Sequence, residues 1–224
     1  METWEYINGH WDTLFKLTWQ HIKIIAVANS IAVILGVIIG IFISGKGRER
    51  IADIVLYLAG IMMTVPSLAL FGLMIPLLSG VGLPGIGFLP AVIALVLYGQ
   101  LPIIRNTYTA IRNVDPAMIE AGKGMGMTPG QLLRRVKLPL AMPVIMAGLR
   151  TAIIMNIAIA TIAAFIGAGG LGLPIFNGIA STRYDVLLAG TIFVSLLSLI
   201  VDGLMAFVER WITPKGMKRG QQIT

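Results

Sequence analysis

The sequence predicts an all-α integral membrane protein that crosses the bilayer five times. Three properties of the 224 residues support this prediction: 57% are hydrophobic, 12% are charged, and the mean hydropathy is +0.88. Soluble chains carry roughly 25% charged residues, and a globule of this size cannot hide so much apolar surface from water. Lipid is therefore the expected solvent. Since one span needs roughly 20 apolar residues, the length leaves no room for a large additional domain.

The predicted spans follow the long apolar runs. These runs cover about residues 22–44, 51–78, 89–109, 140–166 and 186–208. The second run is long for one span and has Pro66 near its middle. A proline removes one backbone donor and bends a helix, so we interpret the run as one kinked helix, with two shorter segments as the alternative.

The chain is expected to divide into three parts. Residues 1–21 contain tryptophans and acidic groups, which suits a segment at the membrane surface. Residues 22–210 form a single transmembrane domain, in which residues 111–139 make a long polar and basic loop. Residues 211–224 are expected to be a tail on the same side as that loop.

The basic residues predict the orientation. With five spans, the loop at 46–50, the segment 111–139 and the C-terminus lie on one side, and that side holds 14 of the 17 basic residues. Cytoplasmic segments carry the excess of Lys and Arg, so we expect the C-terminus in the cytoplasm and the N-terminus outside. Because the basic residues alternate with apolar runs, the net charge of +7 indicates a membrane surface and not a nucleic acid.

Little in the sequence suggests an enzyme. The chain has no cysteine, and its two histidines, His10 and His21, precede the first apolar run, so no catalytic residue and no metal site is expected. Residues 40–47 nearly match a phosphate-binding loop, but Gly47 stands where Ser or Thr must hold magnesium. The glycines at 167, 169 and 172 match the spacing of a dinucleotide-binding fingerprint. That fingerprint follows a β-strand, whereas a predicted membrane span precedes these glycines, so we do not expect a dinucleotide site.

A row of small residues marks one face of the first span. Its members recur every four residues and are Ala28, Ala32, Gly36, Gly40 and Ser44. Small side chains let helix backbones approach closely in lipid. The row predicts either a contact with another subunit or close packing within this chain.

The loop at 111–139 is expected to contain two short capped helices. Asp115-Pro116 is typical of an N-cap followed by a proline in the first turn. Thr128 and Gln131 fit a capping box, and Gly126 lies where the chain must turn between the helices. Leu138-Pro139 is expected to end the second helix before the next span.

This loop resembles the signature "EAA" loop of the permeases of ATP-binding-cassette importers. The resemblance lies in Glu120-Ala121-Gly122, in Gly126 and in the sequence from Val136 to Leu138-Pro139. The chain differs from the family pattern at two positions, where Gly122 replaces an alanine and Val136 an isoleucine. The resemblance implies that the loop couples the permease to a separate ATPase. The coupling residues are then Glu120, Ala121, Gly122, Gly126, Val136, Leu138 and Pro139.

Further motifs resemble the branch that imports quaternary-amine osmoprotectants such as glycine betaine, carnitine and choline. They lie at residues 64–70, 105–108, 112–116, 124–129, 166–172 and 174–176. The resemblance implies a five-span, methionine-permease-like core of a type I importer in a prokaryotic cell membrane, working by alternating access. It also implies two copies of an ATP-binding subunit, a second permease subunit, identical or homologous, and an extracytoplasmic substrate-binding protein. ATP and Mg would bind the partner ATPase, so this chain is expected to carry no cofactor.

Two candidate sites remain. The glycine-rich turn is expected to form an outer gate, with Gly167, Gly169, Gly170 and Gly172 as its residues. Polar and soft residues inside spans are candidates for the translocation path, namely Met63, Thr64, Asn156 and Thr161. Hydrogen bonding between helices is the alternative for these residues, and Asp202 is expected to pair with a basic residue or to reach water.

Other functions stay open at the level of sequence. An importer permease for another small solute, such as methionine, fits the same motifs. An ion-coupled carrier usually needs charged relays at mid-membrane, and Asp202 lies off-centre. A membrane subunit without a pathway is a third alternative.

Overall fold

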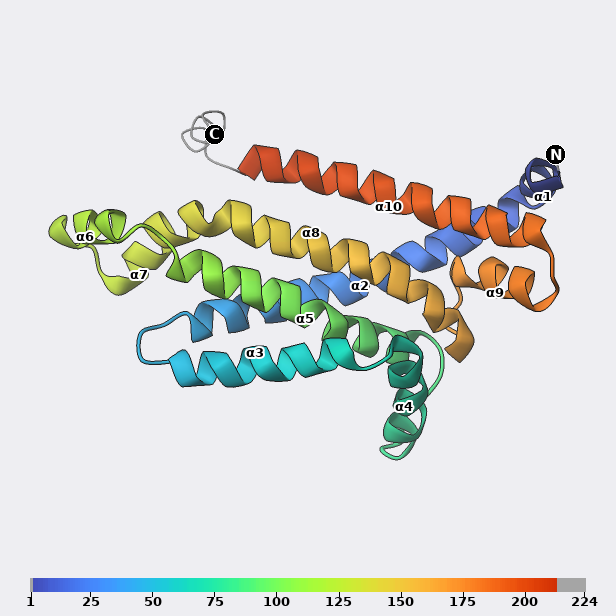
Figure 1. The fold of residues 1–224 in the computed structure, drawn as a ribbon, viewed down its shortest axis with the longest axis horizontal. Helices are drawn as coiled ribbons and strands as arrows, with labels where there is room; N and C mark the ends of the chain where they lie inside the picture. The colour runs from blue at the N-terminus through green and yellow to red at the C-terminus, as the bar shows by residue number, and fades with distance from the viewer. Residues whose placement is uncertain (1, 213–224) are drawn as a thin grey trace.

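The computed structural model describes residues 2–212, and within that range it contains helices and no strand (Figure 1). In chain order the elements are α1 (Glu2–Gly9), α2 (Trp11–Ile43), α3 (Glu49–Thr64), α4 (Ser67–Ser79), α5 (Phe88–Arg112), α6 (Pro116–Gly124), α7 (Pro129–Leu132), the π-helical turn η1 (Leu133–Lys137), α8 (Leu138–Ile162), the 3₁₀ turn η2 (Ala163–Ile166), α9 (Gly172–Ala180) and α10 (Tyr184–Ile212). The predicted tail lies outside the described residues from position 213 onward.

Four helical stretches are long and apolar enough to cross a membrane. They are α2, α5, the stretch Pro129–Ile166 and α10, and the bent pair α3 and α4 makes a fifth if it is one span. The all-helical membrane fold predicted from the sequence is confirmed.

The second apolar run forms two helices and not one. Helices α3 and α4 meet at a bend of 101°, where Val65 and Pro66 have extended ψ angles of 126° and 130°. A residue that precedes proline avoids the helical region, and Pro66 has no N–H to continue the ladder. The hydroxyl of Tyr98 on α5 donates a hydrogen bond of 2.5 Å to the freed carbonyl of Val65. The prediction of one kinked helix is therefore wrong, and the two-segment alternative describes the structure.

Helix α2 begins at Trp11, well before the predicted start near residue 22. Within the segment predicted to lie at the membrane surface, the described residues form α1 and the first turns of α2. Leu14 packs with Ile7 of α1 and Ala189 of α10 in one buried cluster, and Leu14 is only 1% exposed. This apolar contact extends α2 beyond the part that the hydropathy alone predicts.

Leu138-Pro139 does not end the helix, contrary to the prediction. The chain runs from α7 through the π-helical turn η1 into α8, and the N–H of Leu138 bonds to the carbonyl of Leu133, five residues earlier. Proline within the first turn of α8 needs no donor of its own. The wider turn thus carries the helix past a residue that would break regular α geometry.

The core of the bundle is formed by α2, α5 and α8. A Cβ atom at Gly36 would lie 2.6 Å from a side-chain carbon of Ile103, and one at Gly40 would lie 2.6 Å from Thr107, both on α5. Ala28 and Ala32 are wholly buried. The row of small residues therefore packs α2 against α5 within this chain, as one of the two alternatives predicted.

A polar contact ties the same three helices together. The side-chain amide of Asn156 on α8 donates to the side-chain oxygen of Asn29 on α2 at 2.7 Å and to the backbone carbonyl of Leu95 on α5 at 3.1 Å. Asn156 is 0% exposed. A hydrogen bond between helices offsets the free-energy cost of burying an amide.

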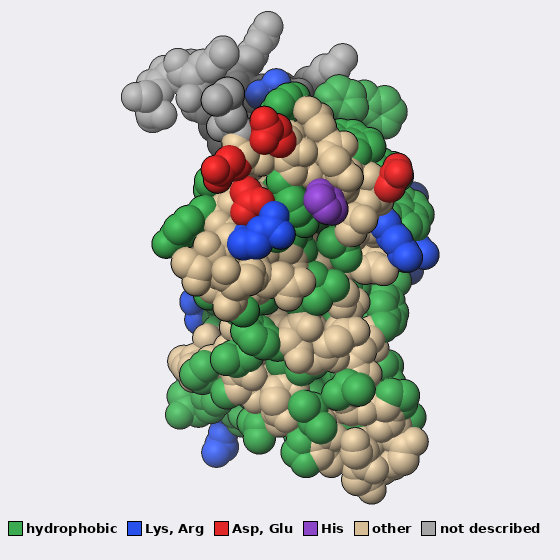
Figure 2. Space-filling model, turned by 90° about the vertical axis from the view of Figure 1, so that its right-hand side faces the viewer, with side chains coloured by type: hydrophobic (Ala, Val, Ile, Leu, Met, Phe, Trp, Pro, Cys, Tyr) green, Lys and Arg blue, Asp and Glu red, His purple; other side chains and the backbone are tan. Residues whose placement is uncertain are grey.

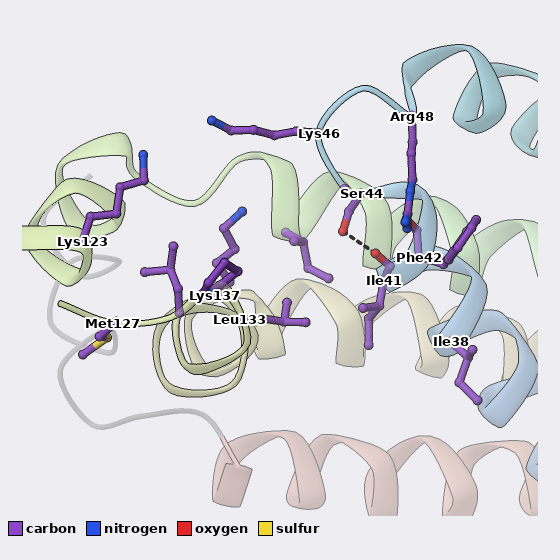
Figure 3. Close-up of a pocket in the computed structure, with 14 residues that line it drawn as sticks. Ile38, Ile41, Phe42, Ser44, Lys46, Arg48, Lys123, Met127, Leu133 and Lys137 are labelled. Carbon is purple, nitrogen blue, oxygen red and sulfur yellow. Dashed lines mark hydrogen bonds between the residues drawn. The ribbon is translucent and has the colours of Figure 1, made fainter.

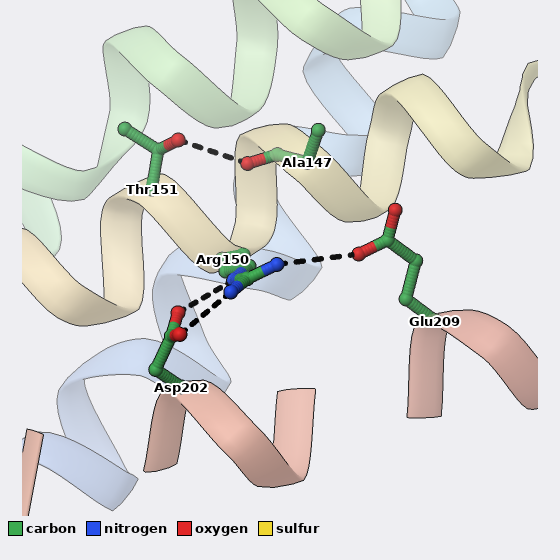
Figure 4. Close-up of polar contacts among 5 residues, drawn as sticks. All are labelled: Ala147, Arg150, Thr151, Asp202 and Glu209. Carbon is green, nitrogen blue, oxygen red and sulfur yellow. Dashed lines mark hydrogen bonds and ion pairs between the residues drawn. The ribbon is translucent and has the colours of Figure 1, made fainter. Parts of the chain in front are cut away.

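Helix α10 lies at the edge of the bundle and is held to α8 by an ion pair (Figure 4). The guanidinium of Arg150 donates two hydrogen bonds to the carboxylate of Asp202, at 2.5 and 2.6 Å, and lies 3.8 Å from Glu209. The predicted pairing of Asp202 with a basic residue is confirmed.

The helices run roughly lengthwise and divide the molecule into two ends (Figure 1). One end carries α6, α7, the α2–α3 connection and the last turns of α10, and we call it the α6–α7 end. The opposite end carries α1, α9 and the start of α10, and we call it the α1–α9 end. Figure 2 views the α1–α9 end, where acidic and basic side chains gather in one region.

Replacing Gly40 by alanine tests the close packing of α2 on α5. A Cβ atom at Gly40 would meet Thr107 and the carbonyl of Ile104, whereas one at Gly60 on α3 would meet nothing within 4 Å. We expect Gly40→Ala to lower the free energy of unfolding by about 1–3 kcal/mol, as overpacking does. Thermal unfolding of the purified protein in detergent should show the loss for Gly40→Ala and no loss for Gly60→Ala. Equal melting temperatures for the two variants would contradict the packing.

Candidate functional site

Helix α6 begins and ends as its sequence predicts. The carboxylate of Asp115 accepts a hydrogen bond of 2.8 Å from the N–H of Ala117, and Pro116 occupies the first turn. The turn after the helix needs Gly126, whose φ of +75° lies in the left-handed region. These features fix the direction in which α6 leaves the end of α5.

Helix α7 packs directly on α6. Thr128 and Gln131 form the predicted capping box, with hydrogen bonds of 2.9 and 3.3 Å between each backbone N–H and the other side chain. A Cβ atom at Gly122 would lie 2.6 Å from Cδ1 of the buried Leu132. The glycine that departs from the family pattern thus lets Leu132 lie against the backbone of α6.

The predicted coupling residues fall into an exposed group, a half-buried group and the buried Gly122. Glu120, Ala121 and Gly126 are exposed, on a part of the chain that extends beyond the ends of the long helices (Figure 1). The half-buried group lies in η1 and at the start of α8, and consists of Val136, Leu138 and Pro139. The structure therefore leaves one group accessible at the surface and packs the other where the segment joins α8.

Two methionines of this segment were missed by the sequence analysis. Met118 is 47% exposed and Met125 is 69% exposed, beside the exposed face of α6. Methionine is flexible and polarisable, which suits a surface that adapts to a partner. The signal was the presence of large apolar residues in a loop that is otherwise polar and basic.

The glycine-rich turn after η2 adopts conformations that require glycine. The φ angles of Gly167, Gly169 and Gly170 are +75°, +81° and +83°. A Cβ atom at Gly172 would overlap the backbone carbonyl of Thr161. Three of the predicted gate residues therefore lie in one tightly folded turn after η2, and the fourth, Gly172, begins α9.

Two residues of α2 hold this turn in place, and the sequence analysis missed both. The side-chain oxygen of Gln20 accepts a hydrogen bond of 3.2 Å from the N–H of Gly170. His21 is 0% exposed and donates from Nε2 to the carbonyl of Ile157 at 3.0 Å, and Gly170 packs directly against its ring. Since a carbonyl only accepts, the proton of the neutral ring lies on Nε2, and Nδ1 has no partner among residues 2–212.

The predicted path residues differ in exposure. Met63 and Thr64 are exposed beside the bend between α3 and α4, and Thr161 is half-buried with its hydroxyl bonded to the carbonyl of Ala158. Asn156 is fully buried in its hydrogen bonds to α2 and α5. Asn156 therefore fits the alternative of hydrogen bonding between helices and lies on no surface of this chain.

The comparison with protein families decides the family of the chain. Residues 32–214 match the family described as "binding-protein-dependent transport system inner membrane component". The chain belongs to this family. It is therefore a multi-pass membrane permease, and the resemblance seen in the sequence is confirmed.

Two relatives match over nearly the whole length. The osmoprotectant import permease protein OsmW of Salmonella typhimurium (strain LT2) is 46% identical over 97% of this chain and 100% of its own. The choline transport system permease protein OpuBB of Bacillus subtilis (strain 168) is 41% identical over 98% of each chain.

A solved structure shows the same fold. A chain of the MetNI methionine ABC transporter, in an inward-facing conformation, superposes with a TM-score of 0.78 at 22% identity, covering 90% of this chain and 96% of that chain. The predicted fold class, the type I importer permease core, is confirmed.

Removing the side chain of Gln20 tests whether α2 holds the glycine-rich turn. A hydrogen bond of this kind contributes about 0.5–1.5 kcal/mol, so Gln20→Ala should raise the amide exchange rate of residues 167–172 roughly 2- to 12-fold. Thr18→Ala is a matched control, because within residues 2–212 the hydroxyl of Thr18 bonds only to the carbonyl of Leu14 in the same helix. Hydrogen–deuterium exchange mass spectrometry on the purified protein measures both rates, and an unchanged rate in Gln20→Ala would show that the contact does not restrain the turn.

Proposed function

We propose that this chain is the permease subunit of an ATP-driven importer for small osmoprotectants such as choline, carnitine and glycine betaine. The observation that carries this proposal is the match to an osmoprotectant import permease along almost the entire length, at 46% identity. A choline permease matches over a similar length at 41%. These matches cover the spans and the α6–α7 segment together.

In the proposed complex, the α6–α7 segment docks onto an ATP-binding subunit. Its exposed residues support this role, because Glu120, Gly126 and the two methionines lie together on a capped and therefore rigid projection. Two such subunits and a second permease subunit complete the transporter. ATP and Mg bind the ATPase partners, so this chain contributes no catalytic residue.

The proposal places the α6–α7 end in the cytoplasm and the N-terminus outside. The α2–α3 connection and residues 111–139 hold seven of the 17 basic residues, and both lie at the α6–α7 end (Figure 1). An excess of Lys and Arg favours the cytoplasmic side. The α1–α9 end then faces the extracytoplasmic binding protein.

Transport by alternating access assigns a role to each end. The docking segment moves with the ATPase, and the continuous helix from α7 through η1 into α8 carries that movement into the membrane. The glycine-rich turn at the other end of α8 closes the path on the outside as the gate. The path itself runs beside the exposed residues Met63 and Thr64 and the half-buried Thr161. Each of these movements requires a contact whose free energy differs between the two conformations that alternate during transport.

The binding protein is proposed to select the substrate. A quaternary ammonium is usually held by several aromatic faces, whereas the ring contacts within residues 2–212 each join two rings, Tyr6 with His10, Trp11 with Phe193, and Phe165 with Phe176. A permease without a cage offers a weak path and leaves the affinity to its partner.

Uptake by cells that express the chain with its ATPase and binding protein tests the proposed function. We expect ATP-dependent uptake of labelled choline, carnitine or glycine betaine, and none when the ATPase is omitted. Gly126→Asp should reach the membrane at normal level and reduce uptake at least tenfold, because aspartate strains the left-handed turn by about 1 kcal/mol and crowds the docking surface.

Two results would contradict the proposed function. Uptake of methionine, without uptake of any quaternary amine, would remove the substrate class. Uptake that persists without an ATPase would remove the importer mechanism and favour an ion-coupled carrier.

A further inference from the structure

A pocket of about 780 Å³ opens at the α6–α7 end, between the last turns of α2, the α2–α3 connection and the segment from α6 to η1 (Figure 3). Its apolar wall includes Ile38, Phe42 and Leu133, and its polar rim includes Lys46, Lys123 and Lys137. No acidic residue of the described range lines it. The pocket thus joins an apolar surface to a group of positive charges.

The three lysines gather without a negative partner. Among residues 2–212, none of them takes part in an ion pair, and the nearest ion pair of this end joins Arg112 to Glu49 at 3.0 Å. The positive charges of Lys46, Lys123 and Arg112 repel that of Lys137, which is itself partly buried. Bringing like charges together raises the free energy, and a bound anion would offset this cost.

Arg48 shapes the pocket from the side of α2. Its guanidinium lies 3.9 Å from the ring centre of Phe42 and donates a hydrogen bond of 2.7 Å to the backbone carbonyl of the same residue. These contacts hold Arg48 and Phe42 together as a fixed wall. The wall does not depend on a ligand, so the pocket is formed in advance.

The apolar wall favours a phospholipid over a free phosphate as the bound anion. Ile38 is 60% exposed and Phe42 is 52% exposed, and both lie on the membrane-spanning helix α2. A free phosphate would satisfy the lysines and leave this surface uncovered, whereas a phospholipid carries a phosphate and an acyl chain on one molecule. Basic pockets between membrane helices bind anionic headgroups in this way.

We propose that this pocket binds one anionic phospholipid. The phosphate lies among Lys46, Lys123 and Lys137, and an acyl chain lies along Ile38 and Phe42. The lipid would contact both the span α2 and the docking segment, and would hold them together. This proposal requires that the chain lies in a membrane and does not depend on the transported substrate.

Native mass spectrometry of the assembled transporter tests the proposal. The complex is exchanged into detergent with either phosphatidylglycerol or phosphatidylcholine, and the lipid retained per complex is counted. We expect retained phosphatidylglycerol to fall at least tenfold in the triple variant Lys46→Gln, Lys123→Gln, Lys137→Gln. The matched control, Lys16→Gln, Lys23→Gln, Arg134→Gln, also loses three positive charges, but none of these residues lines the pocket.

Three further measurements complete the test. The triple Lys→Arg variant should retain the lipid, because it keeps the charges, and 10 mM inorganic phosphate should not displace it. Equal retention of the two lipids, or equal loss in the control, would overturn the site. Displacement by phosphate would show a soluble anion in place of a lipid. Loss of the ATP-binding subunit from the Gln variant, with lipid retention unchanged, would assign the lysines to the ATPase interface.

Discussion

The close approach of α2 and α5 is the constraint on which the rest of the structure depends. In lipid, helices gain little from apolar contact alone, so their association relies on close packing and on hydrogen bonds between helices. Gly36 and Gly40 remove the side chains that would hold the two backbones apart, and the amide of Asn156 joins both helices to α8. The position of α2 then determines both ends of the molecule, since its first turns hold the glycine-rich turn and its last turns form the wall of the lysine-rimmed pocket.

The second structural feature with functional consequences is the uninterrupted helix from α7 to η2. The α6–α7 segment is not joined to its span by a flexible loop, because the π-helical turn η1 continues the helix through Pro139. In the proposed mechanism, a displacement of α6 and α7 therefore reaches α8 directly. π-helical turns within α-helices are frequent at functional sites, and here the turn lies where such a displacement enters the membrane.

Much of this arrangement could be predicted from the sequence, because the signals were local. The lengths of the apolar runs indicated where the long helices lie. The capping residues Asp115, Thr128 and Gln131 act within one turn of their own helices. The positive φ of Gly126 followed from its place between two helices. The candidate coupling residues were selected by their resemblance to a family motif, and three of them, Glu120, Ala121 and Gly126, are exposed.

The errors concern features that only tertiary structure determines. Whether Pro66 kinks a helix or divides it depends on Tyr98, which lies on another helix and satisfies the carbonyl of Val65. The early start of α2 depends on Leu14 packing against α1 and α10. For Asn156 the sequence left two alternatives open, the translocation path and hydrogen bonding between helices, because its partners on α2 and α5 are distant in sequence. The same distance explains why Gln20 and His21 were not linked to the glycine-rich turn.

The central claim is that the α6–α7 segment is the surface on which an ATP-binding subunit docks. Site-directed crosslinking tests it most directly, since the chain has no cysteine of its own. A cysteine at Gly124 or at Gly9 has open space around its Cβ atom, and the two positions lie at opposite ends of the molecule (Figure 1). With a photoreactive thiol reagent on the assembled transporter, Gly124→Cys should crosslink to the ATP-binding subunit and Gly9→Cys should not. An ATPase adduct at Gly9, or none at Gly124, would contradict the claim.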